Sequence, residues 1–75
     1  MKTSRKQIEA MVARLAKITG VPYRTDYAAH YGGYNLYYIP EGRTYHSRGK
    51  YGFDWRKSTE EMAAYMEGLL ADLNP

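Results

Sequence analysis

The sequence predicts an α+β domain in which two helices flank three antiparallel strands, in the order α-β-β-β-α. Three observations predict it. Apolar residues recur at helical spacing near both ends of the chain, and between these two segments apolar and polar residues alternate with a period of two, as in strands. The length of 75 residues accommodates one domain, residues 1–75. Two apolar helix stripes need one sheet face to cover them. Both helices are therefore expected on one face of a three-stranded sheet, and the other face should stay open.

The first helix is expected to begin after Ser4 and to end at Gly20. Ser4 and Gln7 have the spacing of a capping box, in which each side chain bonds the backbone N–H of the other residue, and Thr3 could cap the helix instead. Gly20 permits a left-handed turn, and Pro22 prevents the helix from resuming. The stripe that should face the core consists of Ile8, Met11, Val12, Leu15 and Ile18.

The second helix is expected to begin after Ser58, which forms a capping box with Glu61. Glu60 and Glu61 lie in its first turn, where the helix dipole favours negative charge. Its apolar residues form one continuous stripe, made of Met62, Tyr65, Met66, Leu69, Leu70 and Leu73.

Residues 23–27, 34–39 and 43–55 alternate in the manner of strands and are separated by glycine and proline turns. The last segment could instead be two short strands that turn at Arg48-Gly49; one strand bulged near Gly49 is preferred. The predicted core comprises Ile8, Met11, Val12, Leu15, Ile18, Leu36, Trp55, Met62, Met66, Leu69, Leu70 and Leu73.

The net charge of +3 is distributed unevenly along the chain. Residues 1–22 have five basic and one acidic side chain (+4), residues 23–57 have six and three (+3), and residues 58–75 have four acidic and no basic ones (−4). Such a dipolar molecule can dock on an anionic partner at one end. The alternative is that these charges only keep a small domain soluble.

Nine tyrosines are present, and eight of them lie between Tyr23 and Tyr51. If Leu36 faces the helices, strand alternation places Tyr37 on the open face. Exposed tyrosines suit protein docking, although tyrosine is also simply common in strands. The predicted binding surface has two aromatic anchors and three cations that steer toward an acidic partner, namely Tyr37, Tyr45, Arg43, Arg48 and Lys50.

The predicted function is non-catalytic binding of an acidic protein or a nucleoprotein by a cytoplasmic monomer or weak homodimer. Direct nucleic-acid binding is the alternative, because residues 43–57 interleave cations with aromatic rings. A self-assembling component is a third possibility, based on the small residues Ala64, Gly68 and Ala71. No enzyme, cofactor or metal site is expected, since cysteine is absent and His30 and His46 lack ligand spacing. No membrane span is expected, because no long apolar run occurs.

The predicted order of elements is similar to that of double-stranded-RNA-binding domains. That family clamps phosphate with lysines at the start of its last helix, where this sequence has Lys57 followed by Ser58-Thr59-Glu60-Glu61. Only Lys57 matches, and the two glutamates would repel phosphate. Residues 49–53 are also loosely similar to an aromatic motif of RNA-recognition domains, whose order of elements is different.

A further resemblance covers most of the chain. It rests on four short runs of residues, which are Asp26-Tyr27, Tyr31-Gly32-Gly33-Tyr34 with Leu36, Met62-Ala63-Ala64-Tyr65, and Gly68-Leu69-Leu70. The chain thereby resembles short uncharacterised proteins carried by phages and other mobile elements. The resemblance implies an accessory protein that binds and modulates a host or viral factor, and it implies no functional residues.

Overall fold

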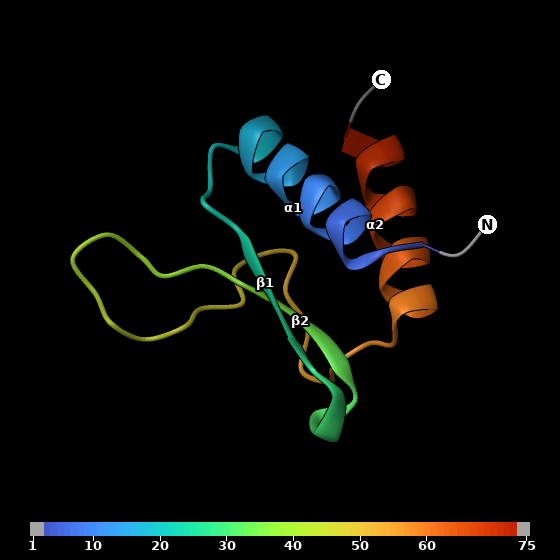
Figure 1. The fold of residues 1–75 in the computed structure, drawn as a ribbon. Coiled ribbons are helices and arrows are strands. Elements are labelled where there is room, and N and C mark those ends of the chain that lie inside the picture. Colours follow the sequence, from blue (N-terminus) through green and yellow to red (C-terminus); the bar gives the residue numbers. More distant parts are fainter. Residues whose placement is uncertain (1–2, 74–75) are drawn as a thin grey trace.

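The computed structural model describes residues 3–73 and shows a small α+β fold with two helices and a two-stranded antiparallel sheet (Figure 1). The elements, in chain order, are α1 (Arg5–Thr19), β1 (Arg24–Ala28), the 3-10 helix η1 (Ala29–Tyr31), β2 (Gly33–Tyr37) and α2 (Thr59–Leu73).

Both helices begin at the predicted caps. The Ser4 hydroxyl accepts a hydrogen bond from the Gln7 N–H at 3.2 Å, and the Ser4 N–H donates to Gln7 Oε1 at 2.7 Å. Ser58 and Glu61 exchange the same two bonds at the start of α2. The α1 helix ends at Gly20, which has a φ of 74° and donates its N–H to the Ala16 carbonyl. The predicted starts of both helices and the predicted end of α1 are confirmed.

The register of β1 and β2 divides the ribbon into two faces. Thr25 pairs with Leu36 and Tyr27 with Tyr34, and these residues share one face. Tyr34 and Leu36 lie in one buried cluster with residues of both helices. The buried hydrophobic residues within 3–73 are Ile8, Val12, Leu15, Tyr23, Tyr34, Leu36, Met62, Ala63 and Met66.

The predicted core is correct for six residues and wrong for Trp55 and Ile18. Ile8, Val12, Leu15, Leu36, Met62 and Met66 are buried, while Met11, Leu69, Leu70 and Leu73 are half-buried against them. Trp55 is 85% exposed and Ile18 is 38% exposed. Strand alternation does not apply to Trp55, because it lies in an irregular bend rather than in a strand. Tyr23, Tyr34 and Ala63 are core residues that the prediction lacks.

The predicted third strand over residues 43–55 is not confirmed. In the described part of the chain, only two isolated antiparallel bridges line the outer edge of β2: Tyr38 with Ser47, and Tyr34 with Lys57. A continuous strand that starts from the first bridge would place residue 51 opposite Tyr34. Lys57 lies there instead, six positions later. Those six additional residues loop out between the bridges, so a regular strand is lost.

Tyrosine hydroxyls explain why the chain loops out. The Tyr23 hydroxyl donates to the Arg48 carbonyl at 3.3 Å and accepts from the Tyr51 N–H at 3.1 Å. The Tyr65 hydroxyl donates to the Tyr51 carbonyl. Gly49 has a φ of 58°, and a Cβ there would lie 2.5 Å from the Tyr23 hydroxyl. The backbone of this segment therefore bonds side chains of the core and not the edge of β2.

The gap in the sheet edge lies at Leu36. The N–H groups of Tyr34 and Tyr38 point to the outer edge and donate to Lys57 and Ser47. By strand alternation the N–H of Leu36 points the same way, where the third strand is missing. It donates instead to the side-chain Oδ1 of Asn35 at 2.9 Å. Asn35 thereby satisfies a backbone donor that a continuous strand would have satisfied.

Candidate binding surface

The face of the ribbon opposite the core carries Arg24, Asp26, Asn35 and Tyr37. The bridge between Tyr38 and Ser47 extends this face outward, since it sets Arg48 beside Tyr37 in the adjacent backbone. Tyr37 is paired with Arg24 on its other side. An aromatic ring thus lies between two arginine positions, and we call Arg24, Tyr37 and Arg48 the cation–tyrosine row.

The Tyr37 ring does not stand free in solvent. It is half-buried and stacks on the His46 ring, with a centroid separation of 4.0 Å and an angle of 11° between the planes. This stack joins the strand to the loop that follows it. Only part of Tyr37 is therefore available as the predicted aromatic anchor.

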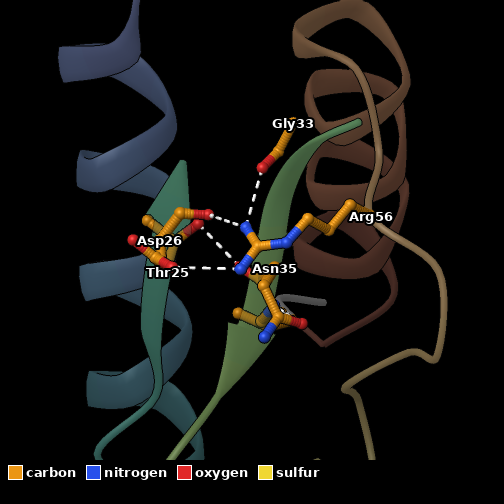
Figure 2. A network of polar contacts seen from close by, with 6 residues as sticks. Thr25, Asp26, Gly33, Asn35 and Arg56 are labelled. Carbon is orange, nitrogen blue, oxygen red and sulfur yellow. Dashed lines mark hydrogen bonds and ion pairs between the residues drawn. The ribbon is translucent and has the colours of Figure 1, made fainter. Parts of the chain in front are cut away.

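Arg56 covers the rest of the open face (Figure 2). Its Nη1 donates to the Gly33 carbonyl at 2.8 Å and to the Asp26 carbonyl at 3.0 Å, and its Nη2 lies 3.0 Å from Asp26 Oδ2. Its side chain is only 22% exposed. Arg56 reaches β1 from outside β2 because Gly33, with a φ of 118°, lets the Lys57 backbone approach closely. The free part of the face is then the cation–tyrosine row.

Residues 39–46 form an extension between Tyr38 and Ser47 that projects away from the helices (Figure 1). A turn shapes its first half, where the Arg43 N–H donates to the Pro40 carbonyl at 3.0 Å. Arg43 is exposed, and Tyr45 is 58% exposed. The extension therefore presents one predicted cation and one predicted ring to solvent.

Trp55 is a surface residue that the sequence prediction placed in the core. It follows Asp54, whose carboxylate forms an exposed ion pair with Arg48, so Trp55 lies near one end of the cation–tyrosine row. Its direct neighbours in the sequence, Asp54 and Arg56, are both charged. This alternation also fits a strand residue that faces the core, so the sequence carries no local signal that would have identified Trp55 as exposed.

The five predicted site residues are not all together. Tyr37 and Arg48 lie on the open face, and Arg43 and Tyr45 lie on the extension. Lys50 is separated from them, because it lines a groove on the helix side of the ribbon, where its Nζ lies 5.6 Å from the centroid of the Tyr51 ring.

Two features are absent from residues 3–73. No three His, Cys, Asp or Glu side chains of this range gather as a metal site would require. Neither of the two helices in this range has the length and apolar character needed to cross a membrane. The surface offers guanidinium groups and aromatic rings, which are groups that bind partners.

Comparison with protein-family models, with curated proteins and with solved structures finds no match for this chain. The resemblance to proteins of mobile elements therefore stays a prediction. The functional argument depends on the surface itself.

Proposed function

We propose that this protein is a non-catalytic binding protein that docks on an acidic surface of a partner protein. The contact would be made by the cation–tyrosine row, the extension and Trp55. The observation that best supports this is the 85% exposure of Trp55 beside the ion-paired Arg48. Burying about 200 Å² of this side chain against a partner would contribute on the order of 5 kcal/mol, and tryptophan is enriched among residues that dominate binding.

Charge selects an acidic partner. Arg24, Arg43 and Arg48 are all exposed on this side of the molecule or on its extension, and Glu41 and Asp54 only partly balance them. Arginine binds a carboxylate through two parallel hydrogen bonds, which favours aspartate and glutamate side chains on the partner. The resemblance described above adds the proposal that the partner is a host or viral factor in the cytoplasm.

Trp55 is expected to contribute most of the affinity and Arg48 a smaller part. Once a pull-down with mass spectrometry has identified the partner, Trp55→Ala should weaken binding about 30-fold or more, as for a central hot-spot residue. Arg48→Gln should weaken it less, and mainly at low salt. Arg14→Gln is the matched control, because it removes an exposed cation of α1. Wild-type affinity in both Trp55→Ala and Arg48→Gln would exclude this surface.

A second candidate is direct binding of single-stranded nucleic acid. It is favoured by a second exposed ring, Tyr31 at 78%, which with Trp55 could stack on bases. Binding of this kind weakens steeply with salt, with a log–log slope of about −0.7 per phosphate contact. Tyr31→Ala should then weaken nucleic-acid binding as much as Trp55→Ala does. A flat salt dependence would remove this candidate and leave protein docking intact.

A further inference from the structure

A groove of about 400 Å³ lies between the ends of the two helices and the loop that contains Lys50. Its walls are mainly apolar or aromatic and include Ile18, Val21, Tyr38, Tyr51 and Leu73. These residues belong to the helix side of the ribbon, so the groove is separate from the cation–tyrosine row. Its volume falls at the lower end of the range for small-molecule sites.

One wall of the groove is formed by the loop, which packs directly on two tyrosines. Gly49 occupies that wall, and it packs so closely on Tyr23 and Tyr38 that a Cβ would lie 2.5 Å from the first and 2.6 Å from the second. Ile18 is 38% exposed beside it, although it belongs to the apolar stripe of α1. Apolar surface that the fold does not cover therefore faces this groove.

The polar groups of the lining differ in whether they already have partners. The Thr19 hydroxyl donates to the Leu15 carbonyl and accepts from the Val21 N–H, and the Tyr23 hydroxyl bonds two backbone groups of the loop. Among residues 3–73, Lys50 is the only charged residue of the lining, and its Nζ lies over the Tyr51 ring. An apolar groove with a single cation is complementary to an apolar molecule with a single negative charge.

We propose that this groove binds a small apolar monocarboxylate. The carboxylate would pair with the Lys50 ammonium, and the hydrocarbon body would lie against Ile18, Val21 and Leu73. The size of the groove fits one ring or a short alkyl chain. This inference does not depend on the proposed docking function, since it uses the opposite side of the ribbon.

The test is a titration of the full chain followed by NMR, with 4-phenylbutyrate as the probe. The matched probe 4-phenylbutanol has the same ring and chain but carries no charge. We expect saturable shifts of the Gly49, Lys50 and Leu73 amides with both probes and tighter binding of the acid. Lys50→Gln should weaken binding of the acid about fivefold, as loss of an exposed ion pair does, and should leave the affinity for the alcohol unchanged. Lys50→Arg should retain the preference for the acid.

Arg43→Gln is the control, because it removes one positive charge on the extension, and Arg43 does not line the groove. Equal affinity of wild type for acid and alcohol would overturn the proposal, and so would an equal loss of acid binding in Arg43→Gln. Shifts confined to amides outside the lining would also overturn it. If the same amides shift with protein concentration alone, a second copy occupies the groove and the small-ligand proposal is wrong.

Discussion

Replacing Arg56 tests how the open face is held together. Arg56→Met keeps a long apolar stem but removes three interactions of the guanidinium group. The bond to the half-enclosed Gly33 carbonyl should contribute about 1 kcal/mol. The exposed bond to the Asp26 carbonyl and the ion pair with its carboxylate, which is 54% exposed, should each contribute only about 0.5 kcal/mol. The expected loss in the free energy of unfolding is about 2 kcal/mol.

Two further variants separate these contributions. Asp26→Asn removes the charge but keeps the backbone carbonyl, so it should cost about 0.5 kcal/mol or less. Arg56→Lys keeps the charge but loses the planar fork that reaches two carbonyls at once, so it should cost about 1 kcal/mol. Arg43→Met, on the exposed extension, is the matched control for an arginine without a structural role and should leave stability unchanged.

Urea and thermal unfolding followed by circular dichroism provide the measurement. For a domain of this size, about 2 kcal/mol corresponds to a fall of roughly 8–16 °C in the melting temperature. The reasoning is refuted if Arg56→Met and Arg43→Met have the same melting temperature, because the network would then contribute nothing to stability. If Asp26→Asn costs as much as Arg56→Met, the ion pair and not the carbonyl bonds would hold the face.

Three other predictions follow from the structure. Gly33→Ala should destabilise the fold by more than about 3 kcal/mol in urea unfolding, since a Cβ would collide with the Lys57 carbonyl at a positive φ, whereas Gly42→Ala, with open space around it, should cost only about 1 kcal/mol. Trp55→Ala should change the free energy of unfolding by less than about 0.5 kcal/mol, and wild-type tryptophan fluorescence should be readily quenched by iodide. Hydrogen bonds from the Ser58 backbone and hydroxyl lower the pKa of Glu61. This cap therefore stabilises the fold above the ordinary pKa of 4.5, and the stabilisation is lost as the pH falls through the lowered value. In Glu61→Gln the free energy of unfolding, measured by urea unfolding at a series of pH values, should consequently depend less on pH in the acid range.

The helices could be predicted from the sequence because their signals are local. A capping box needs two residues three apart, and an apolar stripe needs only its own spacing, so Ser4, Gln7, Ser58 and Glu61 were sufficient to place both N-termini. The first two strands were predicted for the same reason. Their alternation also assigned Leu36 to the core and Tyr37 to the opposite face, as the register shows.

The third strand could not be judged from residues 43–55 alone. Alternation records which side chains are apolar, but it does not record where the backbone finds its hydrogen-bond partners. Those partners are the hydroxyls of Tyr23 and Tyr65, which are distant in sequence from the segment they hold. Tyr51 satisfies a strand pattern and a packed loop equally well, because in both its ring faces the core side.

The same loop decides what the candidate surface contains. In the register of the first bridge, a continuous third strand would place residue 52 opposite Gly33, where β2 begins, so Trp55 would lie beyond the edge of β2. Because six residues loop out, Lys57 takes the edge position opposite Tyr34, and Arg56 lies over the open face where it bonds Asp26. Trp55 itself lies outside the core and is exposed. The loop that the tyrosine hydroxyls hold lies directly before this ring in the chain, so a binding surface built around Trp55 depends on that loop remaining closed.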